Sequence, residues 1–254
     1  MILALDVGNT NIVIGCIERG TIVYDARIAT DHKKTTDEYA IHFKMLLEMY
    51  GIHPDAIDGA IISSVVPPLT NPLKQAVEKI TGVTPFIVGP GIKTGLNIKT
   101  DNPNQLGADL VVDAVAAINE YKAPLIIFDL GTATTCSVID KNLNYLGGMI
   151  FPGVKVAADA LSSHASQLPY ISFDAPKNAI GSNTVDCMKS GIILGNAAMI
   201  DGVIERIEEE LGEKATVIAT GGLSKCIIDH CKREIIYDND LLVKGLWLLY
   251  CKNQ

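Results

Sequence analysis

The sequence lacks an excess of positive charge: its 254 residues hold 21 Lys and Arg against 29 Asp and Glu, a net charge of −8. Nucleic-acid backbones demand basic patches, so this balance argues against a nucleic-acid partner. It also lacks a long hydrophobic run, because the most apolar stretch, Leu241 to Tyr250, is too short to span a bilayer and contains Lys244. No basic segment with a long apolar stretch opens the chain, so we expect no signal peptide, no membrane partner and a cytoplasmic location.

The six cysteines form no pair typical of metal or redox sites. None makes a C-x-x-C motif, and Cys226 and Cys231 do not have zinc-type spacing. We therefore expect all six to be reduced and mostly to act as packing residues. With 48% hydrophobic residues and 22 glycines, the composition is that of a compact α/β protein with a substantial core.

What the sequence does contain is an internal repeat. The apolar run Ile2–Leu5 ends in Asp-Val-Gly-Asn-Thr at positions 6–10, and the run Leu125–Phe128 ends in Asp-Leu-Gly-Thr-Ala at positions 129–133. The two aspartates lie 123 residues apart, and each copy continues with a short apolar run, a polar turn and another strand-like run. This repeat predicts two similar lobes, residues 1–121 and 122–254, facing each other across a cleft.

Each copy places a carboxylate and a glycine turn at the end of a buried strand. Glycine lets backbone N–H groups approach a ligand closely, and Asn9, Thr10 and Thr132 add short polar side chains. Amides and hydroxyls suit phosphate oxygens, while a carboxylate suits a hard cation such as Mg²⁺. One such turn is ordinary turn chemistry, but two at matching places predict a nucleotide site.

Other segments add to this outline. Val217–Leu223 is predicted to be a strand, a Gly-Gly turn and a helix start, which can bring backbone close to a charged ligand. Thr35 to Glu38 forms a capping box that predicts a helix to about Tyr50. Further helices are expected over 72–80, 105–121 and from 240 onward, and a long one over 185–211, broken or thinned by its glycines. The run Glu208-Glu209-Glu210 is most simply a solvated helix end.

The three glycine turns together resemble those of the actin, Hsp70 and sugar-kinase superfamily of ATP-binding folds. Within it, the motif order resembles that of type III pantothenate kinases: Asp6–Asn11, Ser63–Pro67, Asp101–Pro103, Gly107–Asp109, Asp129–Ala133, Gly147–Gly148 with Pro152–Gly153, and Thr220–Gly222. The resemblance covers essentially the whole chain. It implies duplicated ribonuclease H-like (actin-like ATPase) lobes, each a mixed sheet with flanking helices. It also implies ATP-dependent phosphorylation of pantothenate to 4'-phosphopantothenate, the first step of coenzyme A biosynthesis.

The resemblance further implies a role for each motif residue, with Asp109 as the catalytic base. ATP contacts are expected from Asp6, Val7, Gly8, Asn9, Thr10, Asn11, Ile12, Val13, Thr132, Gly221 and Gly222. Substrate contacts are expected from Thr100, Gly107, Ala108, Asp109, Leu110 and Thr184. Thr184 matches a residue that reaches the neighbouring subunit's site, which implies a homodimer with a shared site. Asp129 matches the position that binds a monovalent cation, K⁺ or NH₄⁺, and Asp6 one that holds Mg²⁺ through phosphate or water.

The residues alone leave simpler roles open. Asp109 is also a helix-start acid that favours the helix macrodipole, and Thr184 is also a good helix N-cap before Val185. Asp113 lies one turn after Asp109 on the same helix face, and we expect it to be solvated. His164 and Trp247 are expected to be a surface residue and a core or interface residue, respectively.

Two positions depart from the family pattern. Tyr usually precedes Asp-Asn-Pro, where this chain has Thr100, and Arg usually follows Gly-Ala-Asp, where it has Leu110. An Arg there would pair with the carboxylate of pantothenate, and Lys93 and Lys99 are candidates to replace it. Two alternatives therefore stay open: a kinase of the same fold for another small alcohol, and a non-catalytic ATP-binding regulator. The retained Asp6, Asp109 and Asp129 argue against the regulator, since a protein that only binds need not keep a base.

Overall fold

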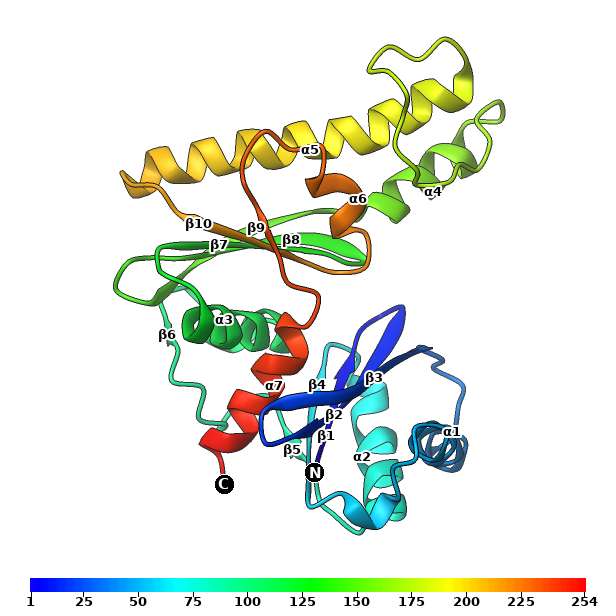
Figure 1. Ribbon diagram of the computed structural model, residues 1–254, viewed down its shortest axis with the longest axis vertical. Coiled ribbons are helices and arrows are strands. Elements are labelled where there is room, and N and C mark those ends of the chain that lie inside the picture. Colours follow the sequence, from blue (N-terminus) through cyan, green and yellow to red (C-terminus); the bar gives the residue numbers. More distant parts are fainter. The chain divides into compact units, whose positions relative to one another are not determined.

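The computed structural model describes all 254 residues, and the chain divides into two compact units. Unit 1 holds residues 1–96, 102–119 and 240–254, and unit 2 holds residues 97–101 and 120–239. Each unit contains a mixed β-sheet with helices packed against it (Figure 1). The α/β class with two mixed sheets that the sequence predicts is confirmed.

Unit 1 is built on a five-stranded sheet in the order β3-β2-β1-β4-β5. Its strands are β1 (Ile2–Val7), β2 (Asn11–Glu18), β3 (Thr21–Ala29), β4 (Gly59–Ser64) and β5 (Phe86–Ile87). Its helices are α1 (Thr36–Met49), α2 (Pro67–Thr81), α3 (Ala108–Glu120) and α7 (Leu241–Lys252), with 3₁₀ turns at Pro54–Ala56 and Pro103–Gln105. Alternate residues of β1 pack into two separate core clusters, one with α1 and α2 and the other with α3 and α7. Helices thus cover both faces of this sheet, and β1 is buried along its length.

Unit 2 is built on a six-stranded sheet in the order β11-β10-β7-β8-β9-β6. Its strands are β6 (Asn97–Ile98), β7 (Leu125–Leu130), β8 (Ala133–Ile139), β9 (Asn144–Pro152), β10 (Thr216–Thr220) and β11 (Ile236–Tyr237). Its helices are α4 (Val154–His164), α5 (Thr184–Leu211) and α6 (Ser224–Ile228), of which α5 runs the length of the unit (Figure 1). One core cluster joins β7, β8 and β10 to all three helices.

The two sheets repeat the same topology. In unit 1, β1 pairs antiparallel with β2 and parallel with β4; in unit 2, β7 pairs antiparallel with β8 and parallel with β10. Asp6 and Asp129 each occupy the fifth position of their strand. The internal repeat predicted from the sequence is therefore present strand for strand.

The last helix corrects the predicted division of the chain. The expected second lobe ran from residue 122 to the end, but residues 240–254 belong to unit 1. The reason is packing: Val243, Leu246 and Leu249 of α7 lie in one core cluster with Ile2 and Ile61 of the first sheet. An apolar helix shows that it needs a partner surface, but not which of two similar sheets supplies it.

Two predicted helices differ from the observed ones. Helix α2 begins at Pro67, five residues before the predicted start at 72, because prolines in the first turn need no hydrogen-bond acceptor for their nitrogen. Helix α5 is continuous from Thr184 to Leu211 despite Gly191, Gly195 and Gly202. Its isoleucines and Val203 are buried in the unit 2 core, and this packing outweighs the low helix propensity of glycine.

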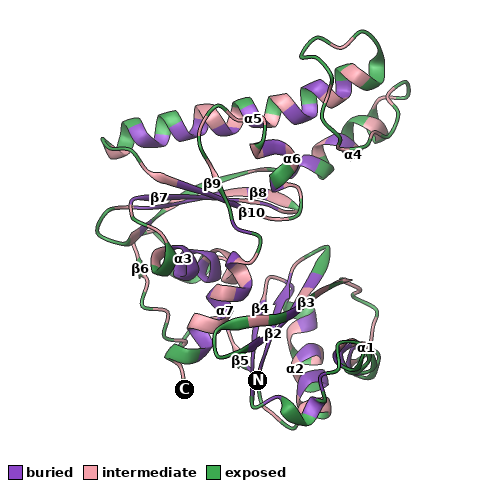
Figure 2. Cartoon of the chain, viewed as in Figure 1, coloured by how far each residue is buried: buried purple, intermediate pink, exposed green.

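Helix α5 is also the one helix long and apolar enough, by length and composition, to cross a membrane. Half of its apolar window is buried inside the protein, and Figure 2 shows buried residues alternating with exposed ones along it. The core helix of a water-soluble protein has these same properties, so the length and composition of α5 alone do not indicate a membrane span.

The acidic end of α5 is not uniformly solvated. Glu208 is 6% exposed, and its carboxylate accepts hydrogen bonds from Lys214 Nζ and Arg233 Nη2, both at 2.6 Å. The prediction of a solvated run is therefore wrong for Glu208, although Glu209 and Glu210 are exposed. By contrast, the capping box is confirmed: Thr35 N–H donates to Glu38 Oε2 at 2.7 Å, and Glu38 N–H donates to Thr35 Oγ1 at 3.3 Å.

Candidate functional site

The first glycine turn, residues 6–10, follows β1 and is held in shape by main-chain contacts. Gly8 N–H donates to Asn11 O at 3.0 Å, and Thr30 braces the turn by donating its hydroxyl to Gly8 O at 2.6 Å. Asp6 is 9% exposed, while Asn9 and the two residues after it are exposed. The turn thus presents its polar tip to solvent beside a buried carboxylate. Ile12 is buried and Val13 half-buried, so these two predicted nucleotide contacts start the next strand.

The second turn, residues 129–133, occupies the matching place in unit 2 but is one residue shorter. Gly131 N–H donates to Ala133 O at 3.1 Å, and Thr132 at the tip is exposed. Asp129 pairs with Thr135 on one side and Thr220 on the other. A side chain at Gly153 would overlap the main-chain carbonyl of Thr132, so the glycine allows α4 to start directly against this turn.

The third turn, Thr220–Gly222, lies beside the second because β10 runs parallel to β7. Gly221 has a φ of +96°, and a Cβ there would overlap Oδ1 of Asp129 and lie 2.8 Å from the main chain of Leu130. Both the backbone angle and the close approach therefore require glycine. Unit 2 thus brings together Asp129, Thr132 and the Gly-Gly turn, as expected.

Asp109 lies in the first turn of α3, in unit 1. Burial raises the pKa of its carboxyl group, and the hydrogen bond from Leu110 N–H to Oδ1, at 2.8 Å, only partly offsets this effect. A Cβ at Gly107 would lie 2.5 Å from the same Oδ1. The glycine in Gly-Ala-Asp therefore leaves room for the aspartate side chain in its observed position.

Asp113 is 2% exposed, so the expectation that it is solvated is wrong. Every residue from Val111 to Ala117 is buried, and no polar face remains on this part of α3. A second buried carboxylate therefore lies one helical turn after Asp109.

Thr100 is positioned by the short strand β6. Asn97 and Ile98 pair with Asn144 and Tyr145 of β9, and Lys99 N–H donates to Tyr145 O at 2.8 Å. The Thr100 Oγ1 atom is buried without a hydrogen-bond partner, and its methyl group lies 3.9 Å from a Cβ built at Gly147. The loop before α3 is thus anchored to the unit 2 sheet just before Thr100, while Gly107, Ala108 and Leu110 are half-buried in unit 1.

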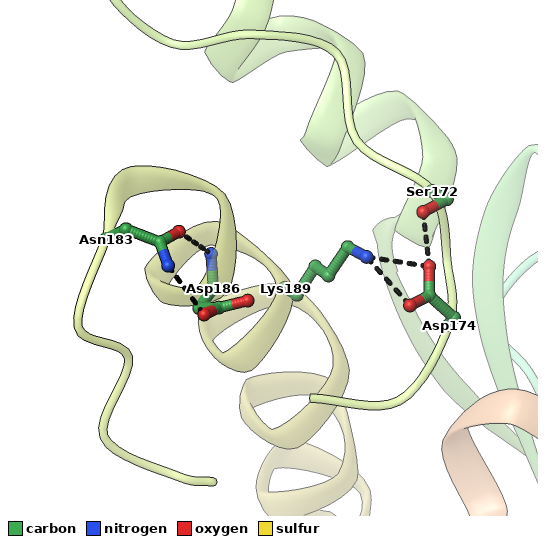
Figure 3. Close-up of polar contacts among 5 residues, drawn as sticks. All are labelled: Ser172, Asp174, Asn183, Asp186 and Lys189. Atoms are coloured by element: carbon green, nitrogen blue, oxygen red, sulfur yellow. Dashed lines mark hydrogen bonds and ion pairs between the residues drawn. The ribbon is translucent and has the colours of Figure 1, made fainter. Parts of the chain in front are cut away.

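Thr184 is the first residue of α5 and is exposed, and it is not the N-cap. The cap is Asn183, whose side chain accepts from Asp186 N–H at 3.0 Å, so the predicted cap was one residue late (Figure 3). One turn further on, Lys189 donates to both carboxylate oxygens of Asp174, at 2.8 and 2.7 Å, and Ser172 also donates to Asp174. These contacts hold the loop that carries Asp174 against the N-terminal part of α5.

Comparison with known proteins identifies the family. The family model for type III pantothenate kinase matches residues 2–206. This chain belongs to the type III pantothenate kinase family. A protein of that name from Halalkalibacterium halodurans is 47% identical over 253 residues, which is 100% of both chains. Another from Bacillus cytotoxicus is 47% identical over 253 residues, 100% of this chain and 97% of the relative.

Solved structures share the fold. The ROK hexokinase from Thermus thermophilus has a TM-score of 0.52 at 11% identity, covering 98% of this chain and 97% of its own. The ethanolamine utilization protein EutJ from Carboxydothermus hydrogenoformans has a TM-score of 0.54 at 15% identity, covering 97% and 89%. At such low identity these likenesses show the fold alone, and they confirm the predicted actin-like ATPase lobes.

Membership of a kinase family implies ATP with a divalent metal ion, and the residues present fit that pair. No group of three or more His, Cys, Asp or Glu side chains is arranged to hold a metal. A hydrated Mg²⁺ suits such a site, because it usually takes one or two carboxylates and completes its shell with phosphate oxygens and water. The buried Asp6 lies next to Ser63 on the neighbouring strand, and the Ser63 hydroxyl has no hydrogen-bond partner.

Sequence reasoning assigned no role to Ser63 or to the Lys189–Asp174 pair. The signal for Ser63 was present, because the motif Ser63–Pro67 is part of the family pattern. The ion pair had no such signal, since an Asp and a Lys fifteen residues apart are common in any sequence.

Proposed function

We propose that this protein transfers the γ-phosphoryl group of ATP to the primary hydroxyl of pantothenate, forming 4'-phosphopantothenate at the start of coenzyme A biosynthesis. The observation that carries the proposal is Asp109. In a chain that belongs to this family, it is a partly buried carboxylate with a raised pKa in the first turn of α3. A pKa raised toward the working pH suits a general base, which must take up a proton in the reaction.

Asp109 accepts the proton of the substrate hydroxyl as the new P–O bond forms and the bond to the ADP oxygen breaks. When bound, Mg·ATP supplies the phosphoryl group and the positive charge that offsets its negative oxygens. Gly107 leaves the space in which the Asp109 carboxylate stays oriented. The chain's own contribution is thus to hold the acceptor, the base and the phosphates in line.

The nucleotide is assigned to the three glycine turns. In unit 1, Asp6 holds Mg²⁺ through phosphate or water, and residues 7–13 follow the phosphates. In unit 2, Thr132 contacts ATP, and Gly221 and Gly222 approach the nucleotide. Asp129 binds the monovalent cation, K⁺ or NH₄⁺. The matching strand positions of Asp6 and Asp129 support this assignment, because each is the fifth residue of a central strand that leads into a glycine turn.

The substrate is assigned to Thr100, to residues 107–110, and to Thr184 of a neighbouring copy in a homodimer. Thr184 is exposed at the start of α5, where a second copy of the chain could reach its side chain. Unit 2 also exposes large apolar side chains, among them Ile150, Tyr170 and Ile180 at 76, 75 and 89%. A homodimer that covered these side chains would remove apolar surface from water, which favours association.

The first test is ADP release by the purified protein with Mg·ATP and K⁺, with and without pantothenate. We expect release that depends on pantothenate and is lost in Asp109→Asn, but is retained in Asp55→Asn, a matched change on a side chain that is 86% exposed. ATP binding without pantothenate-dependent release would contradict the proposal and favour another small alcohol or a regulatory role.

The shared site has its own test. Asp109→Asn and Thr184→Ala are each expected to be nearly inactive alone. In a mixed dimer, one of the two sites would combine the intact Asp109 of one chain with the intact Thr184 of the other. Mixing the variants should therefore restore activity, and no recovery in a preparation shown by light scattering to contain dimers would contradict a site shared in this way.

A further inference from the structure

Ser63 stands out among the buried polar side chains of unit 1. It is 0% exposed, and its hydroxyl has no hydrogen-bond partner. Buried polar atoms in folded proteins are nearly always hydrogen-bonded, so a buried hydroxyl without a partner indicates a group whose partner arrives with a ligand or water.

The neighbour of Ser63 on the sheet is Asp6. Strands β1 and β4 run parallel, and their register pairs Asp6 with Ser63. Side chains alternate between the faces of a strand, and Ala4 of β1 and Ile61 of β4 both pack in the cluster that contains α3 and α7. Asp6 and Ser63, two residues further along each strand, therefore lie on that same face, on strands about 4.8 Å apart.

The next serine shows that the two positions differ in role. Ser64 Oγ accepts hydrogen bonds from Val66 N–H and from the Thr70 hydroxyl, both at 3.1 Å. It thereby fixes the start of α2. Of the two serines in this motif, only Ser63 has a hydroxyl without a structural partner.

The second copy of the repeat has the same arrangement. Asp129 pairs across the parallel strands β7 and β10 with Thr220, which is 4% exposed. A buried hydroxyl residue thus stands beside the strand-end aspartate in both units. Chance placement of one serine does not account for this match.

We infer that Ser63 is a positioning residue for Asp6: its hydroxyl donates a hydrogen bond to the Asp6 carboxylate, directly or through one water, when the metal–nucleotide complex is bound. This inference rests on the proposed role of Asp6 in holding Mg²⁺. Hydrogen-bonding groups behind a ligating carboxylate fix its orientation, and their loss typically lowers metal affinity about 10- to 100-fold.

The test is a thermal-shift titration with Mg²⁺ at a saturating concentration of a non-hydrolysable ATP analogue. In Ser63→Ala we expect the Mg²⁺ concentration at half-maximal shift to rise at least about tenfold. The melting temperature without ligand should not fall, because the change removes a buried hydroxyl that has no partner in the free protein.

Ser63→Thr is the rescue variant, since Thr220 shows that the fold accommodates threonine at this position of the repeat. It should return the Mg²⁺ midpoint toward that of the wild type. Thr134→Ala is the matched control, because it also removes a fully buried hydroxyl without a partner, but from β8 in the other sheet and not from the strand paired with Asp6. Its midpoint should stay at the wild-type value.

A Mg²⁺ midpoint in Ser63→Ala within twofold of the wild type would overturn the inference. So would an equal shift in Thr134→Ala, or an absence of any Mg²⁺-dependent shift in the wild type. Failure of the proposed function is a separate result, because it appears as absent pantothenate-dependent turnover in the wild type, which the binding titration does not require.

Discussion

Glu208 and Glu209 are neighbours in the sequence, but their replacement should have very different effects on stability. The Glu208 side chain is 5% exposed and contacts Lys214, Arg233 and the N–H of Ala215 at 3.1 Å. Glu208→Gln keeps the shape but removes the charge, which leaves two cationic groups without their counter-charge. Glu209→Gln makes the same chemical change on an exposed side chain.

The expected loss can be estimated from burial. Removing one partner of a buried ion pair costs about 3–5 kcal/mol. Here Lys214 is 75% exposed and Arg233 29% exposed, so solvent screens the charges left behind. We therefore expect Glu208→Gln to lower the unfolding free energy by about 2 kcal/mol. At about 2–4 °C per kcal/mol, the melting temperature should fall by about 4–8 °C. Glu209→Gln should stay within about 0.5 kcal/mol of wild type.

The assay is thermal and urea unfolding followed by circular dichroism, since α5 is the longest helix. The pH dependence adds a second check. Burial alone would raise the pKa of Glu208, but the hydrogen bonds from Lys214 and Ala215 and the charge of Arg233 outweigh it and lower the pKa below its ordinary value of 4.5. The stabilisation is therefore present above pH 4.5 and lost as the pH falls through the lowered pKa. Equal melting temperatures for the two variants at neutral pH would refute the reasoning.

The remaining predictions concern activity. Asp109→Asn should lower turnover at least about 100-fold. It should not lower the melting temperature, because burial disfavours the charged form of Asp109 and the variant removes that charge. The raised pKa of Asp109 should also place the acid limb of the wild-type pH–rate profile above the pH range in which an ordinary aspartate titrates. Unchanged turnover would remove Asp109 from the mechanism. Replacing K⁺ by Na⁺ should sharply lower turnover through Asp129, and equal rates in the two salts would contradict that role. Leu110→Arg should lower KM for pantothenate about tenfold or more, because it restores the arginine that pairs with the substrate carboxylate. An unchanged KM, in a variant whose new side chain is seen to point toward the substrate, would contradict this explanation. Asp174→Asn removes the charge that Lys189 contacts and so weakens the contact between this loop and α5. It should raise KM for pantothenate up to about fivefold with little change in kcat. Asp159→Asn, which removes another exposed partner of a lysine, should leave KM unchanged.

The repeat could be predicted from the sequence because its signal is local. An apolar run that ends in Asp-x-Gly indicates a strand and a turn wherever it occurs, and two such runs indicate two sheets. The same holds for the capping box at Thr35, where both partners lie within one helical turn. The strand-end positions of Asp6 and Asp129 and the turn at Gly221 could be predicted for this reason, because each follows directly from the apolar run before it.

The failures share a different cause. Asp113 and Glu208 are acidic residues on helices. The helical pattern predicts the helix face on which each lies, but not which other part of the chain packs over that face. Glu208 is buried because Arg233, 25 residues later, returns to it. The position of α7 depends likewise on a choice between two apolar sheet faces. Ser63 was visible only as part of a motif, and its missing partner is a property of the folded sheet.

Because α7 packs against unit 1, the two units are completed in a fixed order during synthesis. The face of the first sheet that contains Ile2 and Ala4 is completed by Leu246 and Leu249, which follow unit 2 in the chain and therefore leave the ribosome after it. Unit 2 lies between them in the chain and can fold as soon as residue 239 has emerged. The unit whose synthesis starts first is therefore completed after unit 2, and a chain that lacks α7 would expose the apolar face of the first sheet that carries Asp6.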